Sequence, residues 1–125
     1  MGKMRYIVDS DVLIHALNGT KPSTVAFLNR ESDDTLAISL ITWMEVMTGA
    51  TDKNRARTRA FLSSFQEIHG ITPAIAEKAV EMRQTMKLKL PDAIIYATTL
   101  LTGSVLASYN TKDYPRGTPS VHTPR

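Results

Sequence analysis

Five acidic residues lie in or beside stretches of this 125-residue chain that are otherwise strongly apolar. They are Asp9, Asp11, Glu45, Asp92 and Asp113. Glu45 is the only charged residue within residues 36–50, and Asp92 is the only one within residues 90–110. Burial of an ionised carboxylate is costly, and carboxylates that lie close together also repel one another. A divalent cation offsets both costs, and a set of oxygen ligands without sulfur favours Mg²⁺ or Mn²⁺.

Helix capping is the alternative explanation for three of these carboxylates. An Asp at a helix start accepts hydrogen bonds from free backbone N–H groups and interacts favourably with the helix dipole. Asp9, Asp11 and Asp92 each lie at the start of a predicted helix, so capping would account for any one of them alone. Glu45 differs, because it lies inside an apolar helical stretch beyond the first turn. Convergence of the acids in space would favour a metal site over capping.

Apolar runs that alternate with amphipathic stretches predict an α/β fold. The expected strands are residues 5–8, 35–39, 67–71 and 105–108, with 120–123 as a possible fifth. The expected helices are residues 11–17, 23–30, 40–49, 52–65, 73–86 and 91–101. Strands that alternate with helices predict a parallel sheet covered on both faces, in which ligands bind beyond the carboxyl ends of the strands. Asp9 follows the first strand and is therefore expected at that edge.

The composition is that of an ordinary globular domain. Hydrophobic residues make up 42% of the chain and charged residues 22%, a balance that favours a packed core over disorder. The absence of cysteine excludes disulfides and thiolate metal sites. We find no signal peptide and no apolar run long enough to span a membrane. We therefore expect one cytoplasmic domain over residues 1–125, whose net charge of +3 permits a polyanionic partner.

Three stretches, taken together and in this order, resemble the PIN domain, and in particular the small nuclease toxins of VapC type. They are YIVDSDVLIHALNG, SLITWMEVMTG and LPDAIIYATTLLTGSVLASYNTKDY. The resemblance covers essentially the whole chain. It implies a three-layer α/β/α fold around a short, mostly parallel sheet of four to five strands. It also implies metal-dependent endonucleolytic cleavage of RNA that leaves 5′-phosphate and 3′-hydroxyl ends.

The resemblance also implies which residues form the site. Asp9, Glu45, Asp92 and Asp113 match the acidic set that holds Mg²⁺ or Mn²⁺ and carries catalysis. Ser10, Asp11, Thr42 and Asn110 match supporting polar positions of the pocket. Either Asn110 or Asp113 would complete the metal site, and we favour Asp113 because it carries a charge. The number of metal ions, one or two, stays open.

The partners implied by the resemblance are RNA, a VapB-type antitoxin and a second copy of the chain. The antitoxin would place an amphipathic segment in an apolar groove and a basic side chain near the acids. The class of RNA and the cleavage sequence stay open.

Basic residues suggest where the RNA backbone would bind. Lys53, Arg55, Arg57 and Arg59 form a short run that is either a solvated helix face or an electrostatic guide for RNA. Lys87 and Lys89 lie just before Asp92 and are candidate phosphate contacts. The three histidines are scattered along the chain without the spacing of metal ligands.

Two other readings compete with the nuclease. The DSDVL stretch also resembles the start of haloacid dehalogenase phosphatases, whose first aspartate is a covalent nucleophile, but the later glycine-aspartate motif of that family is missing. A response-regulator receiver has similar length and layering, yet LASYNTKDYP lacks its usual lysine spacing. From a different class, a non-catalytic module that binds RNA or protein would keep the acids only as a vestige.

Overall fold

A five-stranded parallel sheet forms the centre of the computed structural model, which describes residues 4–31 and 35–124. The strands are β1 (Arg5–Val8), β2 (Thr35–Ser39), β3 (Glu67–His69), β4 (Val105–Ala107) and β5 (Val121–His122). Their order is β3-β2-β1-β4-β5, and each neighbouring pair is parallel. The carboxyl ends of all five strands therefore lie along one edge of the sheet.

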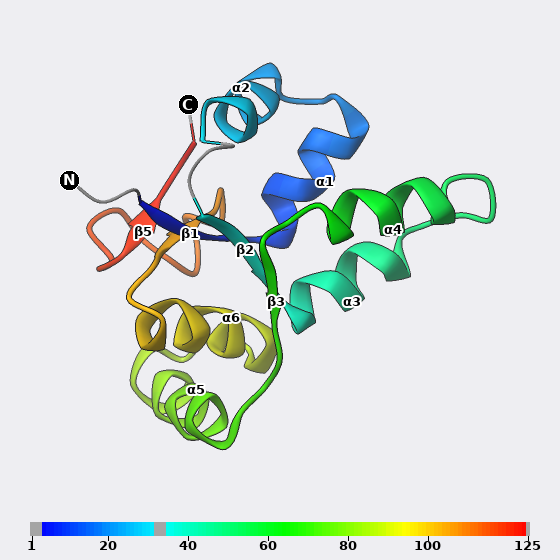
Figure 1. Ribbon diagram of the computed structural model, residues 1–125. Helices are drawn as coiled ribbons and strands as arrows, with labels where there is room; N and C mark the ends of the chain where they lie inside the picture. The colour runs from blue at the N-terminus through cyan, green and yellow to red at the C-terminus, as the bar shows by residue number, and fades with distance from the viewer. Residues whose placement is uncertain (1–3, 32–34, 125) are drawn as a thin grey trace.

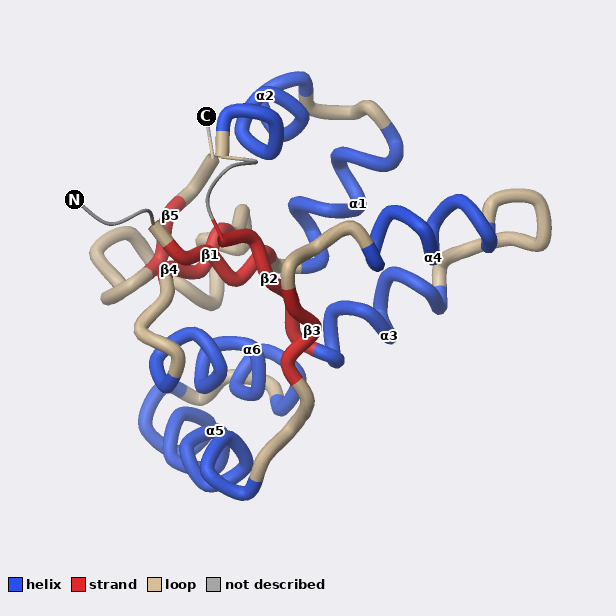
Figure 2. Tube along the Cα trace, in the orientation of Figure 1, coloured by secondary structure: helices blue, strands red, loops and turns tan. Residues whose placement is uncertain are grey.

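Six helices cover the two faces of this sheet (Figures 1 and 2). They are α1 (Ser10–Asn18), α2 (Pro22–Arg30), α3 (Leu40–Thr48), α4 (Arg55–Ser63), α5 (Pro73–Met86) and α6 (Leu90–Leu101). The alternation of side chains along β1 separates two cores. Ile7 packs with the α5–α6 layer, whereas Tyr6 and Val8 pack with side chains of the helices from α1 to α4. The result is three layers, as predicted.

Short polar side chains fix where several helices begin. Ser39 ends β2 and accepts a hydrogen bond from the N–H of Ile41 at 3.1 Å, so the chain turns directly from strand into α3. Thr72 does the same for α5, accepting from the N–H of Ile75 at 3.2 Å, with Pro73 in the first turn. Because α3 follows β2 and α5 follows β3, both helices begin after the carboxyl end of a strand.

The predicted α/β class and parallel sheet are confirmed, and the predicted fifth strand is present at residues 121–122. Several predicted elements are shorter than expected. The helix expected over residues 52–65 covers 55–63, because Asn54 accepts a hydrogen bond from the N–H of Thr51 and holds a turn there. The strand expected over 67–71 ends at His69. None of the helices described is long and apolar enough to cross a membrane.

Candidate active site

Asp9 lies at the carboxyl edge of the sheet, where β1 gives way to α1. It is the N-cap of α1, and its backbone N–H donates to the carbonyl oxygen of Ala107 at 2.9 Å, so β1 and β4 end side by side. The side chain is buried, with one oxygen accepting from the N–H of Ser10 at 2.8 Å. The other oxygen accepts from the hydroxyl of Ser108 at 2.7 Å. Capping and site formation are thus combined in one residue.

The buried position of Asp9 changes its acidity. Burial, followed by the charge of Asp11, raises the pKa of Asp9 to about 7, and Asp92 adds to the rise. The hydrogen bonds from Ser108 and Ser10 act in the opposite direction. A carboxyl group with this pKa is only partly ionised at neutral pH. A nearby cation would favour its ionised form.

Glu45 reaches the same edge from α3. The hydroxyl of Ser10 donates to its Oε1 atom at 2.5 Å, which ties the first turn of α1 to α3. Although the sequence around Glu45 is apolar, the residue is exposed to solvent. It lies on the side of α3 that borders a pocket against α1 and α4.

Asp92 and Asp113 form the remaining acidic pair, from the first turn of α6 and the loop after β4. Burial, then the charges of Asp113 and Glu45, raise the pKa of Asp92 to about 6, while Lys89 lowers it. Asn110 donates to a carboxylate oxygen of Asp113 at 3.0 Å and accepts from its N–H at 3.2 Å. Asp113 therefore faces Asp92, and Asn110 holds it there.

Tyr114 anchors this loop to α6. Its hydroxyl donates to the main-chain carbonyl oxygen of Asp92 at 3.0 Å, and its buried ring packs 5.6 Å from the ring of Tyr96. Burial raises the pKa of Tyr114, so it remains a neutral donor. The residue next to Asp113 thus fixes the distance between the two acidic segments.

Asp11 and Thr42, two of the predicted supporting residues, are less exposed than Glu45. The carboxylate of Asp11 accepts from the N–H of Tyr109 at 3.2 Å, and so binds the chain as it leaves β4. Burial raises the pKa of Asp11. Thr42 is fully buried, and its hydroxyl makes no hydrogen bond with any residue that the structure describes. Such a group in a folded protein calls for a partner.

Ser108 was not among the residues predicted from the sequence. It is buried directly after β4, donates to Asp9, and accepts from the N–H of Asn110 at 3.0 Å. One hydroxyl therefore links the first acid to the loop that carries Asp113. Its position after a strand in the fold was the only available signal, and small polar residues are common at such positions.

The donor chemistry at this edge fits a hard divalent cation. Asp9, Glu45, Asp92 and Asp113 supply only oxygen, the ligand type that Mg²⁺ and Mn²⁺ prefer. Burial first, and neighbouring carboxylates second, raise the pKa values of Asp9 and Asp92, and a bound cation would offset both effects. Across residues 4–31 and 35–124, no three His, Asp or Glu side chains have the arrangement of a preformed metal centre. Asp9 and Glu45 instead accept hydrogen bonds from Ser10 and Ser108.

The predicted basic residues are divided between two regions. Lys87 and Lys89 are exposed in the loop before α6, and Lys89 is close enough to affect Asp92. Arg55 pairs with Asp52 at 2.9 Å on the surface of α4. Arg59 lies 5.6 Å from the ring centre of Trp43. The structure therefore brings Lys89, but neither Arg55 nor Arg59, next to the acids.

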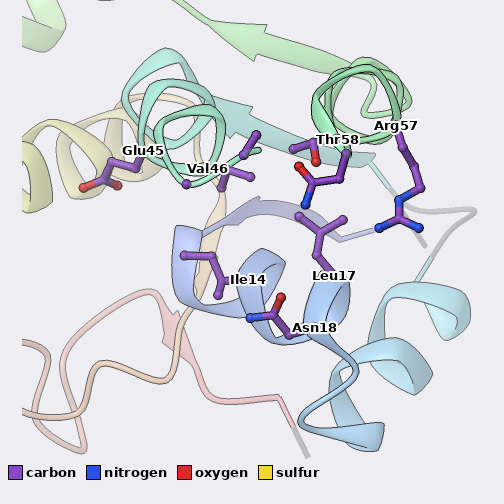
Figure 3. Close-up of a pocket in the computed structure, with 10 residues that line it drawn as sticks. Ile14, Leu17, Asn18, Glu45, Val46, Arg57 and Thr58 are labelled. Atoms are coloured by element: carbon purple, nitrogen blue, oxygen red, sulfur yellow. The ribbon is translucent and has the colours of Figure 1, made fainter. Parts of the chain in front are cut away.

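A pocket of about 170 Å³ lies between α1, α3 and α4 (Figure 3). Ile14 and Leu17 from α1 face Val46 from α3 across it. Glu45 lies at one end and Arg57 at the other. The pocket is therefore apolar in its middle, with a carboxylate at one end and a guanidinium at the other.

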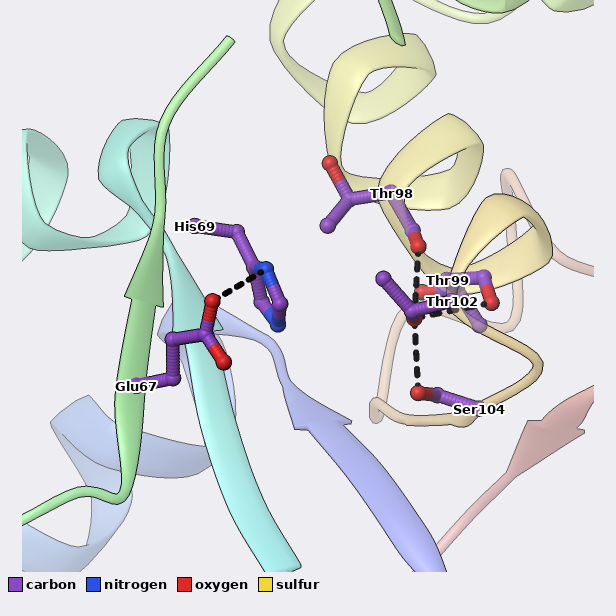
Figure 4. A network of polar contacts seen from close by, with 6 residues as sticks. All are labelled: Glu67, His69, Thr98, Thr99, Thr102 and Ser104. Atoms are coloured by element: carbon purple, nitrogen blue, oxygen red, sulfur yellow. Dashed lines mark hydrogen bonds and ion pairs between the residues drawn. The ribbon is translucent and has the colours of Figure 1, made fainter. Parts of the chain in front are cut away.

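Polar contacts elsewhere have structural explanations (Figure 4). His69 pairs with Glu67 at 3.3 Å on β3. Thr102 donates to the carbonyl oxygen of Thr98 and contacts the hydroxyl of Ser104 at 2.7 Å, which satisfies the C-terminal end of α6. These contacts add no group to the acidic site.

Known proteins share both the sequence pattern and the fold. The model of the PIN domain matches residues 6–116. The chain is 31% identical over 114 residues to "Ribonuclease VapC10" of Mycobacterium tuberculosis, covering 87% of this chain and 85% of that protein. A chain in a "Toxin-antitoxin complex from Klebsiella pneumoniae" superposes with a TM-score of 0.86 at 45% identity, covering 96% of this chain and 98% of that one.

A more distant structure has the same fold. It is VapBC2 from Rickettsia felis, bound to a DNA fragment from its promoter, with a TM-score of 0.75 at 21% identity over 94% of this chain and 96% of that one. The sheet order, the acidic edge and these similarities agree, and the chain belongs to the PIN-domain family, among its VapC-type members.

Proposed function

We propose that this protein is a metal-dependent endoribonuclease and the toxin of a toxin–antitoxin pair. The observation that carries the proposal is the convergence of Asp9, Glu45, Asp92 and Asp113 from four separate segments onto one edge of the sheet. Their mutual influence on pKa supports this convergence. The relative named as a ribonuclease and the neighbour from a toxin–antitoxin complex support the assignment of activity and biological role.

Asp9, Asp92 and Asp113 are the residues that would hold Mg²⁺ or Mn²⁺. The bound ion would supply a Lewis acid that neutralises charge on the phosphodiester and acidifies a water molecule. Ser108 and Asn110 orient the carboxylates of Asp9 and Asp113, respectively. Outer contacts of this kind set the direction of metal ligands and their basicity.

Glu45 is suited to accept the proton of the attacking water. Ser10 occupies its Oε1 atom, which leaves Oε2 with no hydrogen-bond partner among the described residues. Water would then add to phosphorus as the bond to the 3′ oxygen breaks, and the departing 3′ oxygen would take a proton from solvent, which yields a 5′-phosphate and a 3′-hydroxyl end. Lys89, and with it Lys87, would contact the RNA phosphates on the α6 side.

The proposed protein partner is a VapB-type antitoxin. The pocket between α1, α3 and α4 offers Ile14, Leu17 and Val46 to an apolar face of an amphipathic helix, with Glu45 placed to receive a basic side chain. Homodimerisation is part of the same proposal. Exposed apolar side chains such as Leu40 and Met44 on α3 supply surface for it.

RNA cleavage by the purified protein, free of antitoxin, tests the proposal. Structured total RNA is incubated with Mg²⁺, Mn²⁺ or chelator, and the fragment ends are mapped. Asp92→Asn removes one acid of the site. Asp52→Asn is the matched control, because it removes the same charge from an exposed ion pair between the turn before α4 and Arg55.

Discrete cleavage by the wild type and Asp52→Asn that needs metal and is lost in Asp92→Asn is the expected result. No cleavage by the folded wild type, together with no thermal stabilisation by Mn²⁺, would refute the nuclease and leave a non-catalytic binding module. Cleavage that persists in chelator would refute the metal-dependent mechanism.

A further inference from the structure

A second cavity lies beside the acids, in the loop between β4 and β5. This loop runs from orange to red in Figure 1, and residues of the loop, of β5 and Thr123 border an open hollow of about 440 Å³. That volume falls within the range of sites that bind small molecules, roughly 300–1,000 Å³. Neither the acidic site nor the pocket between α1, α3 and α4 includes it.

Two connections join this cavity to the acidic site. Tyr114 lines it, and the hydroxyl of that residue donates to the carbonyl oxygen of Asp92. On its β5 side, the carbonyl oxygen of His122 accepts from the N–H of Ser108, whose hydroxyl donates to Asp9. Two residues that line the cavity, Tyr114 and His122, are therefore each one hydrogen bond from a residue of the acidic site.

The lining of the cavity has the opposite electrostatic character from the acidic site. Among the described residues, no Asp or Glu lines it, whereas Arg116 does, together with hydroxyl groups that include Thr111 and Thr123. Arg116 is exposed and makes no ion pair with any residue in the described part of the chain. A guanidinium beside hydroxyl donors and acceptors suits a phosphate with an attached polar ring, as in a nucleotide.

The backbone around Arg116 is held in a defined turn. Pro115 accepts hydrogen bonds at its carbonyl oxygen from the N–H of Thr118 at 2.9 Å and from its hydroxyl at 2.6 Å. Ser120 has a positive φ of 61°, and its carbonyl oxygen accepts from Leu106 at 2.7 Å. These hydrogen bonds hold the backbone on both sides of Arg116 in place.

We propose that this cavity binds the nucleotide adjoining the scissile phosphate, with Arg116 contacting a phosphate of the substrate RNA. The proposal rests on the ribonuclease function proposed above, and it names a residue that selects and positions the RNA. Contact between Arg116 and a phosphate beside the cleaved bond would give the chain a means of choosing its cleavage site.

The test compares Arg116→Gln, Arg116→Lys and Lys112→Gln with the wild type. Lys112 is exposed in the same loop but does not line the cavity, so Lys112→Gln matches the loss of charge. Each protein is assayed for Mn²⁺-dependent cleavage of a short single-stranded RNA and of a randomised RNA pool. Binding of the short RNA is also measured in chelator over a series of salt concentrations.

We expect Arg116→Gln to raise KM about tenfold with a smaller change in kcat, as for one lost charge-assisted hydrogen bond. Its salt dependence of binding should become shallower by about 0.7 in log–log slope, the value for one phosphate contact on a single strand. Arg116→Lys should recover part of the affinity, and the cleavage profile of the pool should change in Arg116→Gln.

Equal effects of Arg116→Gln and Lys112→Gln would overturn the inference, since that result reports only general charge. An unchanged profile and KM in Arg116→Gln would overturn it as well. Failure of the wild type to cleave any RNA would instead count against the proposed function itself, so the two failures are distinguishable.

Discussion

Replacement of Asp9 by asparagine should stabilise the metal-free protein at high pH. The carboxyl group has an ordinary pKa of 3.8 and a pKa of about 7 in the fold. The unfolded chain therefore releases this proton at a lower pH than the folded protein does. Stability contributed by the protonated group is fully present below pH 3.8, and it is lost as pH rises through 7. Asparagine cannot ionise, so the variant escapes this loss.

The size of the effect follows from the two pKa values. The rise in pKa from 3.8 to about 7 lowers the free energy of unfolding by about 4 kcal/mol at pH 8 and by under about 1 kcal/mol at pH 4. Asn is as good an N-cap as Asp, and its amide can pair with Ser10 and Ser108, so little of the gain is lost to capping. Urea unfolding of the wild type and Asp9→Asn in chelator, at pH 4 and pH 8, measures the difference in their free energies of unfolding.

Chelator is essential to this comparison, because a bound cation would remove the penalty that the substitution relieves. Asp52→Asn serves as the control, and its stability should stay within about 0.5 kcal/mol of the wild type at both pH values. The reasoning would be refuted if Asp9→Asn were no more stable than the wild type at pH 8. It would also be refuted if the difference in free energy of unfolding between the two proteins were the same at both pH values.

Three further substitutions test two hydrogen bonds of the site and the backbone conformation of Lys87. Ser108→Ala removes a hydrogen bond that lowers the pKa of Asp9, and should weaken Mn²⁺ binding at pH 7 about tenfold in a calorimetric titration; an unchanged affinity would contradict its orienting role. Tyr114→Phe removes the hydrogen bond to the carbonyl oxygen of Asp92 and should lower the free energy of unfolding in urea by about 1 kcal/mol; an unchanged value would contradict that hydrogen bond. Lys87→Gly should raise stability by about 0.5 kcal/mol, because Lys87 has a φ of 58° that glycine adopts without strain; a lower midpoint in thermal unfolding would contradict that conformation.

The sequence was sufficient to predict the layers, and it singled out the acids as candidates, because both depend on strong local contrasts. A charge in an apolar run is conspicuous, and Asp9 follows a strand whose carboxyl end must lie at the binding edge of a parallel sheet. The alternation of strands and helices then predicted the three layers, and the pairing of β1 with both β2 and β4 brings their ends together.

The remaining features depend on tertiary geometry that local patterns do not contain. The helix α3 is apolar around much of its circumference, so periodicity did not reveal that Glu45 is exposed and Thr42 buried. Ser108 carries no charge to mark it, although its hydroxyl joins two parts of the site. The turn at Asn54 shortened a helix that composition alone extends to residue 52.

Anomalous scattering from crystals soaked in Mn²⁺ tests the central claim, that these carboxylates form one metal site, most directly. The account predicts a manganese peak between Asp9 and Asp92, with carboxylate oxygens about 2.1 Å away and Asp113 or Asn110 turned toward it. The same peak should be missing in Asp92→Asn. A wild-type crystal with no peak at this edge of the sheet, or with manganese bound only elsewhere on the surface, would contradict the account.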